Sequence, residues 1–187
     1  MTSPCKLMLL VTLALMAACR SEPIQFHTLM PTQVSRSPAG SEIAIESVSV
    51  PAQVDRAQIV VRQGASGLAI LETQWWGASL ADELRSALAE QLSSGVPGQQ
   101  RSVRIIVQRF DSVPGQYALL DTKWRLRVAA GASLDCRSVV QSPAGASIDA
   151  VVTAHQRNLM RLASLINQTA RNPQAGCAAS PSLGPGV

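Results

Sequence analysis

The sequence predicts an α+β domain in which a largely antiparallel sheet is covered by two main helices. Most apolar segments alternate with a period of two residues, as strands with one buried face do. Two other segments space their apolar residues three and four apart, as amphipathic helices do. The order along the chain is strands, a helix, further strands and a second helix, which is typical of α+β domains.

Short strands separated by breaker residues are predicted in the first half of the folded region. The alternation changes phase near Glu46 and Ser47, which predicts a strand with a β-bulge. Two later apolar runs are separated by glycines and are expected to pair as a hairpin. The expected strands cover residues 25–29, 43–50, 58–62 and 68–71.

Two amphipathic helices are predicted by their leucine and alanine spacing. Leucines recur at every fourth position from Leu80 to Leu92, and Ser79 is a suitable N-cap for this helix. The second helix is predicted over residues 149–169, with His155 on its apolar face.

Between the helices, a second hairpin is expected from the strands 103–110 and 117–128. In the second of these strands the apolar side chains share one parity and the charged ones, Asp121 among them, share the other. One face is therefore predicted to be buried and one to face water. A further strand around residues 134–140 places Cys136 on the buried face.

The N-terminus has the pattern of an export signal. Lys6 precedes an apolar run, residues 7–16, that is too short to span a bilayer, and two alanines and Cys19 follow it. The stretch resembles a bacterial lipoprotein signal, so cleavage before Cys19 and acylation of its thiol, with palmitate among the acyl groups, are expected. The alternative is an ordinary secreted protein with a cysteine near the cleavage site. Arg20 is not the aspartate associated with inner-membrane retention, which favours the periplasmic face of the outer membrane.

Composition and charge exclude some partners. The expected signal, residues 1–18, holds one of the sixteen basic side chains and no acidic one, which leaves fifteen basic against twelve acidic side chains and a net charge of +3. The remaining length suits one domain. The basic residues are not clustered and aromatic residues are few, so nucleic acid is not an expected partner.

Two cysteines remain once Cys5 leaves with the signal and Cys19 is acylated. In an oxidising periplasm Cys136 and Cys177 are expected to form a disulfide. A metal site would need further cysteine or histidine ligands at short spacing, and the sequence does not offer them. No metal and no other cofactor is expected.

No catalytic constellation is recognisable in the sequence. His155 has neither a nucleophile motif nor a second histidine nearby in sequence, so a structural role in the core or at an interface is expected. Asp82 and Glu83 are adjacent on a helix and point in different directions, and favourable charge at the helix start explains them. No glycine-rich phosphate loop follows a strand. The chain is therefore expected not to be an enzyme.

Four stretches carry a resemblance to a known family: residues 43–62, 73–92, 103–128 and 150–167. Their most specific pieces are Val50-Pro51 followed by Asp55-Arg56, the tryptophan before the helix at Leu80, and the run from Phe110 to Trp124. Together these stretches are similar to the ABC-type transport auxiliary lipoproteins, the family that includes paraquat-inducible protein C.

The resemblance implies a non-enzymatic outer-membrane lipoprotein that assists an MCE-type ABC lipid transport system, helps to connect the two membranes and helps to maintain envelope integrity. The implied partner is an MCE-domain protein, and the chain is expected to act as a homo-oligomer. The alternative is a membrane-anchored periplasmic wall-binding module or hydrolase. That alternative requires converging carboxylates or a Ser/His set, which the sequence does not suggest.

The surface expected to contact the partner combines the loop at Asp55 and Arg56 with the junction at Trp75 and Trp76. Charged and large aromatic groups on connections are enriched where partners dock. Two alternatives stay open: Asp55 and Arg56 structure a turn, or both tryptophans are buried within the domain.

The expected organisation has four parts. They are a lipoprotein signal peptide over residues 1–18, an acylated N-terminus with a short extended segment and a linker over residues 19–41, an α+β domain over residues 42–172 that segment 25–29 joins, and a flexible tail over residues 173–187 that is rich in Ala, Gly, Pro and Ser.

Overall fold

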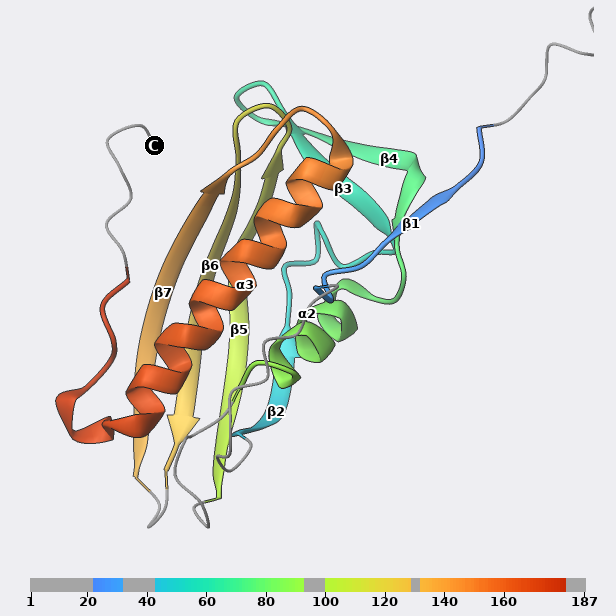
Figure 1. Cartoon of the computed structure of the whole chain (residues 1–187). Coiled ribbons are helices and arrows are strands. Elements are labelled where there is room, and N and C mark those ends of the chain that lie inside the picture. Colours follow the sequence, from blue (N-terminus) through green and yellow to red (C-terminus); the bar gives the residue numbers. More distant parts are fainter. Residues whose placement is uncertain (1–21, 32–42, 93–99, 129–131, 181–187) are drawn as a thin grey trace, which may run out of the picture.

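The computed structural model describes residues 22–31, 43–92, 100–128 and 132–180, and Figure 1 shows how the elements are arranged. The expected signal and the lipidation at Cys19 lie outside these ranges. The described elements are β1 (Gln25–His27), β2 (Ile43–Ser49), β3 (Gln58–Gln63), β4 (Gly67–Trp76), α2 (Leu80–Ala89), β5 (Arg101–Val113), β6 (Tyr117–Arg127), β7 (Ser133–Pro143), α3 (Ile148–Arg171) and a short 3₁₀ helix, η2 (Pro173–Ala175).

The strands form two sheets. The large sheet has the order β2-β5-β6-β7, in which β5, β6 and β7 are antiparallel and β2 is parallel to β5. The small sheet has the order β1-β4-β3, in which β3 and β4 form the predicted hairpin and β1 runs parallel to β4. The predicted α+β class is confirmed, with the strands divided between two sheets.

Both helices lie over the same face of the large sheet (Figure 1). α3 runs along β6 and β7, while α2 packs against β2 and α3. Leu80, Leu84 and Leu88 of α2 are buried, as their spacing predicts. Ser79 is the N-cap of this helix, and its hydroxyl accepts from the Asp82 N–H at 3.2 Å. The sequence pattern therefore predicts both the buried leucines of α2 and the residue at which the helix begins.

The core fills the space between the helices and the large sheet. Leu120 and Leu126 of β6 and Leu159 of α3 are completely buried. Burying one such side chain contributes about 1.5–3 kcal/mol, so this layer is the main source of stability. The indole N–H of Trp124 donates to the Ser138 hydroxyl at 3.0 Å, which satisfies a polar group inside the layer.

Two irregularities shape the large sheet. The register between β2 and β5 shifts between Ile45 and Ser47, where the sequence predicts a bulge. A second shift lies between Val107 and Arg109 of β5, where the sequence predicts none. After this second bulge Phe110 faces the core, where its ring stacks on His155 with the centroids 3.8 Å apart.

The opposite face of the large sheet is partly covered without a helix. Its alternation places Asp121 in water, yet this residue is only 3% exposed. Arg137 donates two hydrogen bonds to the Asp121 carboxylate, at 3.0 and 2.8 Å. Leu119, on the same face, is also buried. Long arginine side chains cover neighbouring strands with their methylene stems. The alternation of a strand therefore predicts the face on which a side chain lies but not the exposed fraction of that side chain.

The segment after α3 is tied to the domain. A disulfide joins Cys136 of β7 to Cys177, as the cysteine count predicts. The N–H of Val139 donates to the Ser180 hydroxyl at 3.3 Å. The sequence predicts a flexible tail except at Cys177; of its described residues, Cys177 and Ser180 contact β7, and the Ala178 N–H donates to the Thr169 hydroxyl of α3 at 3.0 Å. The rest of that tail lies outside the described residues.

Candidate functional site

His155 and Ser112 form a hydrogen-bonded pair inside the core. The His155 Nε2 lies 2.9 Å from the Ser112 Oγ, and both residues are buried. Burial lowers the pKa of His155 to about 3, because the charged imidazolium loses its hydration there. The imidazole is therefore neutral near pH 7. The expected structural role of His155 agrees with this environment.

The described residues contain no group of three or more His, Cys, Asp or Glu side chains that could hold a metal ion. Within the same ranges, no helix has the length and apolar character needed to cross a membrane.

The two stretches expected to form a contact surface lie side by side. The backbone N–H of Trp76 donates to the Ala57 carbonyl at 2.7 Å, and Trp75 pairs with Gln58. Ala57 directly follows Arg56, so the charged loop and the tryptophan junction are neighbours. Asp55 and Arg56 are both exposed.

The two tryptophans have different environments, which answers the question that the sequence leaves open. Trp76 is 3% exposed and packs edge-on against Phe110, with ring centroids 6.2 Å apart. Trp75 is half-buried, and its indole N–H donates to the Glu72 carbonyl at 2.9 Å. Trp76 does not reach the surface, so the candidate contact surface contains Asp55, Arg56 and Trp75.

Phe26 joins this surface, although sequence reasoning did not single it out. β1 pairs with the end of β4 so that Phe26 is opposite Trp75, and their rings meet edge-on with centroids 6.3 Å apart. Phe26 is 67% exposed. The two residues are far apart in sequence, and no local pattern reports a parallel pairing between strands so distant.

β1 and the residues that follow it are held by polar contacts to the rest of the domain. The Gly77 N–H donates to the His27 carbonyl at 2.8 Å. The Leu29 N–H and the Thr28 hydroxyl donate to the Glu83 carboxylate, at 2.8 and 2.7 Å. Sequence reasoning assigned Glu83 only to helix-start electrostatics, whereas this buried carboxylate also holds the N-terminal segment on α2.

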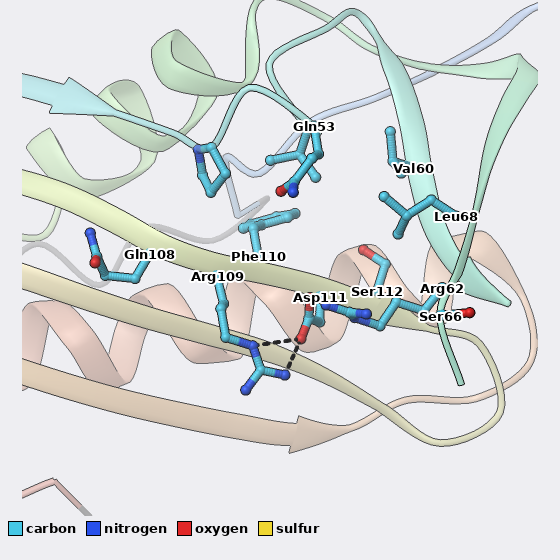
Figure 2. A pocket seen from close by; sticks show the side chains of 12 residues that line it. Gln53, Val60, Arg62, Ser66, Leu68, Gln108, Arg109, Phe110, Asp111 and Ser112 are labelled. Atoms are coloured by element: carbon cyan, nitrogen blue, oxygen red, sulfur yellow. Dashed lines mark hydrogen bonds and ion pairs between the residues drawn. The ribbon is translucent and has the colours of Figure 1, made fainter. Parts of the chain in front are cut away.

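A cavity of about 180 Å³ lies between the small sheet and the β5 bulge, and Figure 2 shows its lining. Asp111 of β5 faces two guanidinium groups there. The Arg62 Nε lies 2.8 Å from Asp111 Oδ1, and the Arg109 Nε donates to Asp111 Oδ2 at 3.1 Å. Both arginines bind the Asp111 carboxylate. Because Arg62 belongs to β3 and Asp111 to β5, this ion pair links the small sheet to the large one. Arg62 comes from a different sheet, and sequence reasoning found no signal for this cluster.

The outer face of the large sheet pairs its charges between strands. The Ser102 hydroxyl donates to Glu46 at 2.6 Å and, together with neighbouring arginines, lowers the pKa of that carboxyl. Hydrogen bonds from Arg125 lower the pKa of Asp135. These groups are exposed, so the pairs contribute little to stability. With its charges satisfied in this way, this face is a weaker candidate site than the surface at Trp75.

Comparison with known proteins gives a family match over most of the chain. The model of a family described as the ABC-type transport auxiliary lipoprotein component matches residues 26–167. No curated protein is significantly similar in sequence.

Two crystal structures have a similar fold. One, of an uncharacterised protein, superposes with a TM-score of 0.65 at 17% identity, over 79% of this chain and 98% of that chain. The other, of a DUF330 family protein from Xanthomonas campestris, gives a TM-score of 0.63 at 19% identity, over 81% of this chain and 98% of that chain. At this identity the similarity shows a shared fold.

Proposed function

This chain belongs to the ABC-type transport auxiliary lipoprotein family, and from that premise we propose that it is a non-enzymatic, lipid-anchored component of an MCE-type ABC lipid transport system. In this proposal the protein sits at the periplasmic face of the outer membrane as a homo-oligomer. It binds an MCE-domain protein, helps to connect the inner and outer membranes, and so supports envelope integrity.

The sequence around Cys19 supports the anchor. Two alanines precede this cysteine after a short apolar run, and the family-matched region begins a few residues later, at residue 26. Acyl chains contribute about 0.8 kcal/mol for each buried CH₂, so several chains hold the protein on the membrane almost permanently.

The anchor has a direct test. Cys19→Ser should yield unprocessed or soluble protein, and mass spectrometry of the wild-type N-terminus should find an acylated cysteine. An unmodified mature N-terminus in the wild type would contradict the anchor.

The observation that carries the binding role is that the exposed loop at Asp55 and Arg56 and the half-buried Trp75 lie on neighbouring segments, joined by the hydrogen bond between Trp76 and Ala57. Exposed charge beside a large aromatic ring is a frequent composition of contact surfaces. Since Trp76 is buried, the contact itself is assigned to the other three side chains.

We expect Arg56→Ala and Trp75→Ala to weaken co-purification with the MCE-domain protein while the thermal unfolding midpoint stays close to that of the wild type. Met160→Ala is the matched control, because Met160 is an exposed apolar residue on α3. Unchanged co-purification in both surface variants would refute this contact. Turnover of a wall or lipid substrate by the purified protein would refute the non-enzymatic role itself.

A further inference from the structure

Three large apolar side chains lie on or beside β1: Ile24 directly precedes the strand, Phe26 lies within it, and Trp75 of β4 is opposite Phe26. We call them the β1 apolar surface. Ile24 is 46% and Phe26 67% exposed, and Phe26 has the largest exposed fraction among the large hydrophobic residues of the described ranges. Trp75 is half-buried against Phe26. Burying apolar surface is favourable, so the surface is expected to be covered when the protein functions.

The β1 apolar surface is fixed in place and cannot turn inward. Neighbouring residues of a strand face opposite sides, and the side opposite Phe26 is occupied by His27. The His27 Nε2 lies 2.6 Å from the Gln74 amide oxygen, and its Nδ1 lies 3.3 Å from the Asp149 carboxylate. Pairing with β4 and the contacts to Glu83 hold the segment on both sides of this residue.

The surface lies close to the proposed anchor. An extended chain advances at most about 3.6 Å per residue, so Phe26 stands within about 25 Å of Cys19 and Ile24 within about 18 Å. β1 lies beside β4, and the described residues that precede it extend away from the body of the domain (Figure 1). Acylation at Cys19 therefore keeps Ile24 and Phe26 within these distances of the membrane surface.

We propose that the β1 apolar surface rests in the interfacial layer of the anchoring membrane, so that the protein contacts the bilayer through side chains as well as acyl chains. The inference rests on the proposed lipidation of Cys19. Tryptophan and other aromatic side chains favour this layer, because one part of the ring system is apolar and another can form hydrogen bonds. Contact with lipid on the Phe26 side leaves the Asp55 and Arg56 side of Trp75 for the protein partner.

The contact fixes the orientation of the domain. A single flexible tether would let the domain rotate over the membrane, whereas a tether combined with a side-chain contact a few residues away holds one edge of the small sheet downward. The proposed partner surface, which is continuous with that edge through Trp75, is then presented at a constant height above the bilayer.

Quenching of tryptophan fluorescence by brominated lipids tests the proposal. The full, acylated lipoprotein is reconstituted into phosphatidylcholine vesicles made with plain or brominated acyl chains. Zwitterionic lipid suffices, because the β1 apolar surface carries no charge. The protein has three tryptophans, of which Trp76 and Trp124 are 3% and 2% exposed and serve as internal references for a folded core.

We expect brominated lipid to quench part of the wild-type emission and Trp75→Phe to lose that quenched component. Phe26→Ser should lose most of the quenching, while Met160→Ser, at a 46% exposed position on α3, should retain it. Phe26→Ser removes little buried surface, so its unfolding midpoint should stay near that of the wild type and the variant remains interpretable.

The outcomes separate this inference from the proposed anchoring. Protein that floats with the vesicles but shows equal emission in plain and brominated lipid overturns the membrane contact and leaves the anchor intact. Wild-type protein that does not float overturns the anchor, and the contact with it. Absence of quenching combined with a change in oligomeric state in Phe26→Ser assigns the surface to a second copy of the chain and also overturns the proposal.

Discussion

The two sheets of this molecule cover their apolar residues in different ways. The large sheet places one face under α2 and α3, and completely buried leucines fill the layer between them. The small sheet carries β1 at an edge, where Ile24 and Phe26 remain exposed beside Trp75. The difference separates two roles: the large sheet, joined by inward residues of the small sheet such as Ile59 and Trp76, supplies the core, and the β1 edge of the small sheet supplies surface for contact.

Adjacent tryptophans give the strongest test of this comparison. Trp76→Ala should destabilise the protein by about 3–5 kcal/mol, because it empties a core site next to Phe110. Trp75→Ala should cost much less, since that ring is already half in solvent. Urea denaturation of the two variants measures both values. Equal losses would show that Trp75 is packed as tightly as the core ring of Trp76 and would contradict a surface role for it.

Acidification should act on the large-sheet core through His155. Its pKa of about 3 in the folded state lies below the ordinary value of 6.5, so the unfolded chain binds the proton first. Stability is therefore full above pH 6.5 and falls as the pH drops from 6.5 toward 3. The loss amounts to several kcal/mol across that window.

His155→Gln keeps a polar group beside Ser112 but removes the titration. We expect its unfolding free energy to vary less between pH 6.5 and 4.5 than that of the wild type, as measured by denaturant titration at each pH. Parallel curves for the two proteins would mean that the buried imidazole does not control acid stability.

A smaller effect is expected where the two regions join, at Glu83. Glu83→Gln replaces a charged acceptor with a neutral one and should cost about 1.5–3 kcal/mol, the usual contribution of hydrogen bonds to charged groups. The local consequence is the sharper test: amide hydrogen exchange should accelerate at Leu29, whose N–H donates to this carboxylate, while that of β6 stays slow. Uniform acceleration would contradict a role confined to the junction.

Sequence patterns predicted the features that depend on neighbouring residues. The bulge at Ser47, the cap at Ser79 and the β3–β4 hairpin follow from local alternation and breaker residues. The disulfide between Cys136 and Cys177 follows from counting the cysteines that the expected signal and acylation leave. The first three features depend on a short segment, and the disulfide depends on the number of cysteines. None of them requires knowledge of which strand lies beside which.

Features that depend on non-local neighbours escaped prediction. Asp121 is buried beside Arg137 of the adjacent strand, which donates hydrogen bonds to its carboxylate. Asp111 forms an ion pair with Arg62, which belongs to the other sheet. For the candidate site, the sequence indicated Asp55, Arg56 and the tryptophan pair but could not tell the buried ring from the half-exposed one. Phe26 was missed because its importance comes from a parallel pairing with β4, which no local pattern encodes.

That parallel pairing also constrains the order in which the protein can assemble. During synthesis the N-terminal end of the chain emerges first, and a parallel partner cannot be supplied by a tight turn. β1 has no partner until the end of β4, at Trp76, has emerged, and β2 has none until β5 has followed. The hairpins of β5, β6 and β7 need only short loops to close, whereas both N-terminal strands wait for distant segments. β1 therefore stays without a strand partner early in assembly, although it is the first described strand to be synthesised.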